Sequence, residues 1–470
     1  MAFYGDNYRY IILTIGFLCL ASVCSNYIII NFTFICMKED TSETRIVDNV
    51  TRGIYDYTAN EKKWIMWFVA AGTIIGTVPT NYLVVRFGAK WPFLIAGILS
   101  AVSTMLIPIA AAYRFDVLLG LRFLQGLAYS TDFAAIGIIT VRWAPLQDTA
   151  TFIAVLTCFT GASSMITNSA TGLICQSYGW KYAYYIHSIV GLGLFFLWFL
   201  TYDNNPATTG KLSDKERSTI QRNKSCAHLE KNPEIPYLKL ATSPVILVVW
   251  LNAFFEMSAI IMFATYMPIY FHQVLGFGVT KTGFYVGLVL GVNIPLRIVG
   301  ARCSDMITSV PEIWKIRFFN TISVGISGLL LSAIGFFEKE HREICFIVTL
   351  TCMMCTSVNC GGFYKSAVLH ARQFSHVVIA AIQFTKCLAL FVAPALVAFF
   401  VTDEMNRVQW IPVFMTLGVA MFLANIISLF VFTTEPAEWT EDKKIVEMDQ
   451  FENLTPHSKF SNYRNPTVGR

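Results

Sequence analysis

Long apolar segments alternate with short polar breaks along almost the whole chain. A helix that crosses a lipid bilayer needs about 20 mostly apolar residues, and twelve stretches of the sequence satisfy that requirement. We expect these helices to begin near Tyr10, Trp64, Trp91, Val117, Thr151, Ala183, Thr242, Val279, Phe318, Ile344, His376 and Val408. The pattern therefore predicts an all-α integral membrane protein with twelve transmembrane helices.

One polar interruption is much longer than the others. The chain from Tyr202 to Leu240 is hydrophilic and charged, so it separates six predicted helices from the next six. We expect an N-terminal six-helix half over residues 1–202, a linker over 203–241 and a C-terminal six-helix half over 242–433. The tail over 434–470 is polar, as disordered segments are. Within the linker, the residues after Ser213 predict a short surface helix that this serine caps.

The positive residues of the loops predict how the chain is oriented. Cytosolic loops are enriched in Lys and Arg, and the linker is the loop richest in them. This places the linker and both termini in the cytosol. Asn49, in an Asn-Val-Thr sequon between the first two helices, then lies outside and is the expected glycosylation site. The sequons at Asn223 and Asn453 lie inside.

Composition agrees with a membrane protein and argues against other classes. The 470 residues are 55% hydrophobic and only 14% charged, whereas soluble domains have about a quarter charged residues. The net charge of +5 is not gathered into a basic stripe, so no nucleic-acid partner is expected. No G-x-S-x-G, Walker A or H-E-x-x-H motif occurs. We therefore expect no enzyme activity, no metal and no cofactor.

The positions of the cysteines in the sequence do not indicate a disulfide framework. Most of the twelve fall within predicted helices, where Cys behaves as a small packing residue. Cys352, Cys355 and Cys360 share one apolar segment without a nearby redox partner. We expect them to pack between helices.

Four charged side chains interrupt the predicted helices: Arg122, Asp132, Glu256 and Lys386. An ionised group at the bilayer centre costs about 2.5–3.5 kcal/mol on insertion scales. We therefore expect these groups to face the interior, where transporter halves enclose a watery path. Arg122 and Asp132 are about 15 Å apart along a helix, so they would line one cavity at two depths.

These charged residues also have interpretations that involve no substrate. Arg122 could extend to the outer interface, and Lys386 could simply pair with one of the acids. Arg297 and Lys365 lie nearer the predicted cytosolic helix ends, where long basic side chains usually extend to the interface.

Several short motifs occur in an order that resembles the anion/cation symporter family of the major facilitator superfamily. They are RFLQGL at 122–127, WAP at 143–145, GWKYAYYIHSIVGL from 179, YDNNPATTGKLSDKER from 202 and TTEPAEW from 433. This family includes sialin, the vesicular glutamate transporters and the sodium–phosphate cotransporter-like solute carriers. The resemblance implies a major facilitator fold and a role for Arg122 in substrate binding or gating. We recognise no sorting signal in the tail, so a plasma-membrane location and an endolysosomal or vesicular location both stay open.

The chain departs from the family pattern at positions that matter for an anionic substrate. Ile29 stands where such members carry an Arg in helix one, and Tyr129 replaces an acid of helix four. Glu256 stands where the glutamate-carrying branch has an Arg. Gln383 replaces an Asn of helix eleven, and Lys386 occupies a position that is usually small. We count Arg122, Asp132, Glu256, Gln383 and Lys386 as candidate substrate or gating residues.

The resemblance implies secondary active transport of a small organic anion by alternating access. The expected partners are that solute, a coupling ion (sodium or a proton) and the lipid bilayer. Because positive charge is lost and negative charge gained relative to the family, a zwitterion or a cation is an alternative substrate. A receptor or scaffold that keeps the fold without transporting is the alternative from another class of function.

Overall fold

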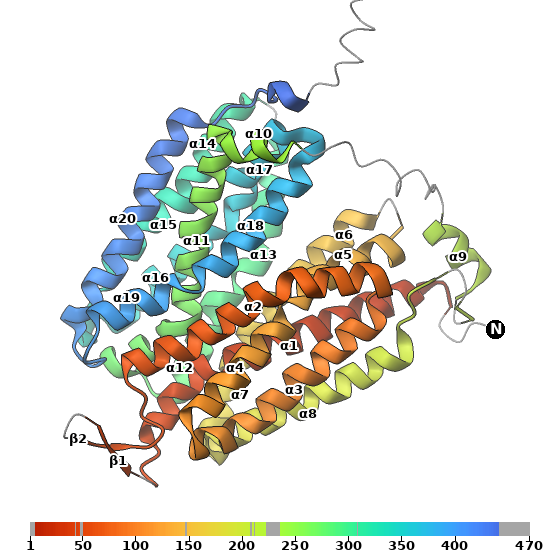
Figure 1. Ribbon diagram of the computed structural model, residues 1–470. Coiled ribbons are helices and arrows are strands. Elements are labelled where there is room, and N and C mark those ends of the chain that lie inside the picture. Colours follow the sequence, from red (N-terminus) through yellow and green to blue (C-terminus); the bar gives the residue numbers. More distant parts are fainter. Residues whose placement is uncertain are drawn as a thin grey trace, which may run out of the picture.

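The computed structural model describes residues 5–42, 44–47, 50–145, 148–206, 209–210, 212–221, 236–307 and 309–440. This part of the chain folds into two bundles of helices (Figure 1). Eleven helices in it are long and apolar enough to cross a membrane. The remaining crossing, α6 (Thr149–Thr157) with α7 (Phe159–Tyr178), carries more polar residues and is not among those eleven. The predicted helical membrane fold is confirmed, with eleven of the twelve predicted crossings recognised by length and hydropathy.

The first bundle holds six crossings and one small hairpin. Its helices are α1 (Tyr8–Glu39), α2 (Ala59–Phe87), α3 (Lys90–Tyr113), α4 (Phe115–Tyr129), α5 (Thr131–Trp143), α6, α7 and α8 (Trp180–Thr201). Between α1 and α2, β1 (Thr44–Val47) pairs antiparallel with β2 (Val50–Gly53). The linker contributes α9 (Asp214–Gln221) and α10 (Tyr237–Thr242).

The second bundle holds the other six crossings, several of them interrupted. They are α11 (Pro244–Ile269) with a π turn at Tyr270–Val274, α12 (Val279–Gly291) with α13 (Asn293–Met306), α14 (Glu312–Asn320) with α15 (Ser327–Ile334), α16 (Arg342–Thr356) with α17 (Phe363–Ala371), α18 (Ser375–Ala389) with α19 (Val392–Phe400), and α20 (Arg407–Val431).

Local side-chain bonds explain where the helices differ from the hydropathy pattern. Helix α2 begins before Trp64 because Thr58 and Glu61 form a capping box, in which each side chain satisfies the other's backbone N–H. The predicted fourth helix is broken at Ser130, whose hydroxyl donates to the carbonyl of Leu127 at 2.7 Å. Such bonds back to the preceding turn bend helices. Ser213 caps α9 as predicted, because its hydroxyl accepts from the backbone N–H of Glu216.

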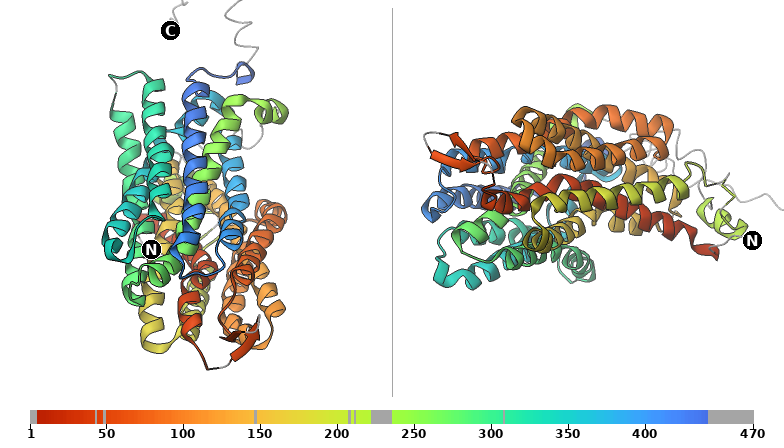
Figure 2. Two further views of the ribbon diagram at one scale, coloured as in Figure 1. Left: turned by 90° about the vertical axis from the view of Figure 1, so that its left-hand side faces the viewer. Right: turned by 90° about the horizontal axis from the view of Figure 1, so that it is seen from below.

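The two ends of the molecule are distinct. We call the end with β1 and β2 the hairpin face, and the opposite end with α9 and α10 the linker face. Figure 2 shows the hairpin and the N-terminus at opposite ends of the first bundle. The bundles meet near the hairpin face and diverge toward the linker face (Figure 1).

Small residues let two helix pairs approach backbone to backbone. A Cβ added at Gly126 of α4 would stand 2.1 Å from the carbonyl oxygen of Val69 in α2. A Cβ at Gly283 of α12 would stand 2.6 Å from the carbonyl oxygen of Asn168 in α7. Close small-residue contacts of this kind drive helix association in membranes. The second pair joins the two bundles, so it fixes their mutual position.

Candidate functional site

Ion pairs join the two bundles at the hairpin face. The Glu404 carboxylate, in the turn before α20, accepts from Lys62 at the start of α2 and lies 3.4 Å from the ammonium group of Lys38 at the end of α1. The Glu404 side chain is only 11% exposed. Nearby, Nε2 of His272 lies 3.1 Å from a carboxylate oxygen of Glu39. The two halves are therefore tied together by charge at this end.

Further polar contacts between the halves lie deeper in the molecule. The Asn31 amide of α1 donates to the carbonyl of Ala264 in α11 at 3.1 Å. The Trp67 indole of α2 donates to the carbonyl of Phe391 at 3.1 Å, just before α19. Together with the ion pairs, these contacts close the hairpin side of the interface between the halves.

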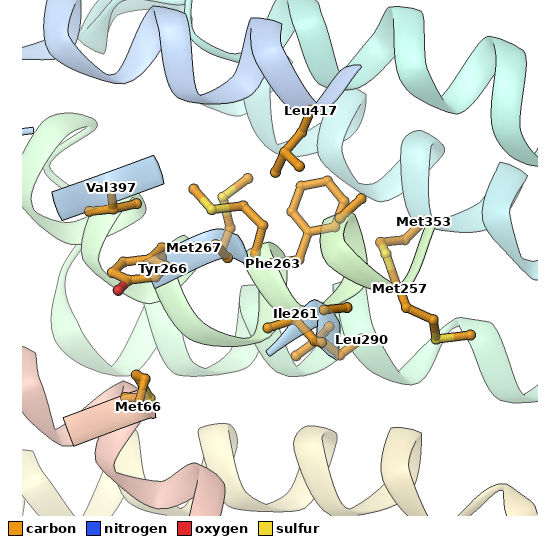
Figure 3. Close-up of a cluster of buried hydrophobic side chains, with 14 of the residues drawn as sticks. Met66, Met257, Ile261, Phe263, Tyr266, Met267, Leu290, Met353, Val397 and Leu417 are labelled. Atoms are coloured by element: carbon orange, nitrogen blue, oxygen red, sulfur yellow. The ribbon is translucent and has the colours of Figure 1, made fainter. Parts of the chain in front are cut away.

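A cavity of about 140 Å³ lies between the halves. The first bundle contributes Tyr27, Ile28, Thr157, Cys158, Phe159, Thr160, Gly161 and Ser164, and the second contributes Met257, Ile260, Ile261, Ala264, Leu290, Asn293, Ile294, Arg297, Met353, Tyr364 and Lys386. Much of the wall is apolar, and Figure 3 shows part of it in the cluster of Met257, Ile261, Leu290 and Met353. Two cations, Arg297 and Lys386, interrupt that wall.

The position of Arg297 corrects an expectation. We expected its side chain to extend to the interface, but it lines the cavity. The reason is that α13 continues to Met306, which leaves Arg297 well inside the crossing. Lys365, the other expected interfacial residue, pairs instead with Glu312 at 3.0 Å.

Lys386 connects the cavity to the first bundle. Its ammonium nitrogen lies 3.3 Å from the hydroxyl oxygen of Tyr129 and interacts electrostatically with Asp132. The Asp132 side chain is fully buried, and neither carboxylate oxygen has a hydrogen-bond partner among the described residues. Asp132 does not itself line the cavity.

Glu256 of α11 is the other acid near the cavity, and it is not among the lining residues. It is fully buried, and one carboxylate oxygen accepts from the amide of Asn359 at 2.5 Å. It interacts electrostatically with Arg297. The site therefore contains two couples of a lining cation and a buried acid, Arg297 with Glu256 and Lys386 with Asp132.

Arg122 stands apart from these couples. Its guanidinium is fully buried within the first bundle, where it donates to the carbonyl of Tyr27 at 2.9 Å and to the side-chain oxygen of Gln125 at 2.5 Å. It does not line the cavity. Tyr27 does line it, so the hydrogen bond to its carbonyl connects Arg122 to the cavity wall through the backbone of α1.

Two predicted residues cannot be placed in this site. The side chain of Gln383 and the whole of Asn49 lie outside the described residues. The sequence reasoning missed Arg297, Asn359 and Tyr364. The sequence could have indicated Arg297 as a site residue, because an Arg in the middle of a membrane crossing needs a polar environment. Nothing in the sequence distinguished Asn359 and Tyr364, because both residue types are common in membrane helices.

The chain belongs to the major facilitator superfamily, whose family model matches residues 16–394. Several curated transporters are similar to this chain. An uncharacterized transporter of Caenorhabditis elegans is 24% identical over 89% of this chain and 79% of its own. The probable small intestine urate exporter of Mus musculus is 24% identical over 83% and 79%. Sialin of Ovis aries is 23% identical over 70% and 66%.

Solved structures share the fold. A D-xylose-proton symporter superposes with a TM-score of 0.66 at 15% identity, covering 91% of this chain and 98% of its own. A bacterial homolog of the lysosomal transporter Spinster, in its inward-facing and occupied conformation, gives 0.63 at 13% identity over 90% and 96%. The protein is an integral membrane transporter and not an enzyme.

Proposed function

We propose that this protein is a secondary active transporter that moves a small organic anion by alternating access, coupled to sodium or proton movement. The observation that carries the proposal is the cavity between the halves, where Arg297 and Lys386 present two positive charges on an otherwise largely apolar wall. Cations in a poorly hydrated site form strong, charge-assisted bonds to carboxylates and related anions. The two cations would replace the positive charge that the chain lacks at Ile29 and Glu256.

The closed hairpin side supports one state of the transport cycle. With the linker face in the cytosol, as the loop charges predict, the ion pairs of Glu404 close the outer side. The chain then stands in an inward-facing state, with both termini cytosolic and Asn49 outside. The membrane is the plasma membrane or an endolysosomal or vesicular membrane. An anionic solute is also favoured by the similarity to a protein described as a probable urate exporter.

A zwitterion or a cation is the second candidate substrate. It is favoured by Asp132 and Glu256, because each is an ionisable acid that interacts electrostatically with one lining cation. A compact zwitterion could place its acid group between the cations and its amine toward the aromatic hydroxyl groups of Tyr27 and Tyr364.

Uptake into proteoliposomes tests the proposal. Purified protein is reconstituted, and anionic, zwitterionic and cationic solutes of similar size are offered with a sodium or a proton gradient. Gradient-dependent accumulation of an anion supports the proposal, and accumulation of only zwitterions or cations favours the second candidate. If no solute in a broad panel accumulates or exchanges, a receptor or scaffold that keeps the fold is the better reading.

A further inference from the structure

The thiols of Cys36 and Cys175 meet although the residues are far apart in the sequence. Cys36 lies near the end of α1 and Cys175 near the end of α7, and the two thiol groups are close enough to interact directly. Both line a pocket of about 390 Å³ with Glu39, Gln176 and Trp180. Cys36 is buried, whereas Cys175 is partly exposed. An oxidant can therefore reach Cys175 first and Cys36 through it.

This pocket belongs to the hairpin face, because both helices end there. Disulfides form and persist on the non-cytosolic side of membranes and are rare in the cytosol. We propose that Cys36 and Cys175 form a disulfide in the mature protein, which ties α1 to α7 at the hairpin face. The inference rests on the proposed orientation of the chain.

The chemistry is two successive thiol–disulfide exchanges with a protein disulfide oxidoreductase of the secretory route. The Cys175 thiolate attacks the disulfide of the oxidoreductase, so a mixed disulfide forms and one sulfur of the oxidoreductase leaves as a thiolate. The Cys36 thiolate then attacks the Cys175 sulfur and releases the second sulfur. Each cysteine loses one proton, and the two electrons reduce the oxidoreductase to its dithiol form.

The bond would lie directly beside contacts that hold the two halves together. Glu39, three residues after Cys36, pairs with His272 of the second bundle. Gln176, next to Cys175, accepts from the Thr280 hydroxyl of α12. A disulfide would therefore fix the relative positions of two helix ends that close the hairpin side.

Other cysteines provide an internal control. Cys352 and Cys355 are three residues apart on α16, and the Cys352 thiol donates to the carbonyl of Ser327 at 3.3 Å. Because Cys352 is fully buried, no oxidant reaches it in the folded protein. The pair Cys36–Cys175 and the pair Cys352–Cys355 differ in their access to an oxidant and in the groups that they contact. Of these two pairs, only Cys36–Cys175 should be oxidised.

The test is peptide mapping of full-length protein made in a eukaryotic secretory host and purified without reductant. The protein is denatured in the presence of N-ethylmaleimide, so that buried free thiols are blocked as well, and is then digested. Samples are compared with and without later reduction. We expect a linked Cys36–Cys175 peptide pair that disappears on reduction, and maleimide-labelled Cys352. Recovery of both Cys36 and Cys175 as maleimide adducts would overturn the inference.

A stability measurement provides a second readout that does not depend on peptide recovery. Reductant should lower the melting temperature of the wild-type protein by several degrees and leave Cys36→Ser and Cys175→Ser unchanged. An equal decrease in the wild-type protein and both variants contradicts the bond. Solute uptake by the same preparations separates the two proposals: uptake with free thiols overturns only the disulfide, and a linked pair without uptake overturns only transport.

Discussion

The ammonium nitrogen of Lys386 lies 3.3 Å from the hydroxyl oxygen of Tyr129, and this contact crosses from the second bundle to the first beside the cavity. Tyr129 occupies the position of an acid in the family pattern, so the Lys386 cation is hydrogen-bonded there by a neutral group. Asp132 interacts electrostatically with the same cation, but the group in hydrogen-bond contact with it is a neutral hydroxyl. Lys386 also lines the cavity, so it is one of the cations that the proposed anionic solute would meet.

Replacing Lys386 should weaken anion uptake. Hydrogen bonds to a charged group contribute about 1.5–3 kcal/mol, so Lys386→Gln should raise the half-saturating anion concentration by roughly tenfold or more. Initial uptake rates in proteoliposomes measure this. Lys365→Gln is the matched control, because Lys365 pairs with Glu312 and does not line the cavity. Equal effects of the two substitutions would show that Lys386 does not bind the solute.

Removing the acid behind Lys386 should have the opposite effect. Asp132→Asn keeps the size of the side chain but removes an ionisable carboxyl group that interacts electrostatically with Lys386. Anion uptake should therefore strengthen several-fold relative to cation uptake, and Glu256→Gln should do the same through Arg297. Paired anionic and cationic solutes are offered between about pH 5 and pH 8, where carboxylates of functional sites can titrate. Unchanged selectivity and pH profile in both variants would make the acids incidental to substrate choice.

Arg122 should act through its hydrogen bonds as well as its charge. Arg122→Lys keeps the charge but cannot bridge the Tyr27 carbonyl and the Gln125 side chain in the same way. We expect uptake to fall at least tenfold while surface expression stays near that of the wild type. Surface biotinylation beside uptake separates the two effects. A parallel loss of expression and uptake would make Arg122 a folding residue.

The ion pairs of Glu404 should hold the hairpin side closed over the physiological pH range. Burial of the carboxylate opposes its ionisation, but the charges of Lys62 and Lys38 outweigh burial and hold the pKa of Glu404 below its ordinary value of 4.5. A group whose pKa is lowered in the closed state stabilises that state above its ordinary pKa and loses this contribution as pH falls through the lowered value. Closure should therefore persist from pH 8 to pH 5.

Spin-label or fluorophore distances across the hairpin face measure this closure. Glu404→Gln should lengthen the distance between the halves at neutral pH, and the wild type should lengthen only below about pH 4.5, the ordinary pKa of this carboxyl group. Glu338→Gln, which removes a pairing within the second bundle, is the control. Opening of the wild type already at pH 6 would assign the closure to another group.

Glycosylation should report the orientation of the chain. Asn49→Gln should abolish a glycosidase-sensitive mass shift on gels, and Asn223→Gln should leave it in place. The loop charges place only Asn49 on the side where the glycosylation machinery acts. A shift that survives Asn49→Gln and disappears in Asn223→Gln would reverse the orientation, and with it the inferred disulfide.

The sequence by itself determined the number of crossings and the presence of charges inside them. Hydropathy is a local property, and a bilayer-spanning helix satisfies its own backbone hydrogen bonds, so each crossing can be recognised without its neighbours. The hydropathy pattern did not predict the break at Ser130 or the early start of α2, because each depends on single side-chain hydrogen bonds.

Only the tertiary structure decided which side chains contact one another. Lys386 with Tyr129, Glu256 with Asn359 and Cys36 with Cys175 each join helices that are far apart in the chain. Such contacts depend on how each helix is rotated and on which helices are neighbours. Rotation and neighbours are fixed by close approaches such as that of Gly283 to Asn168. Because these approaches come from the packing of the whole bundle, no local pattern in the sequence encodes them.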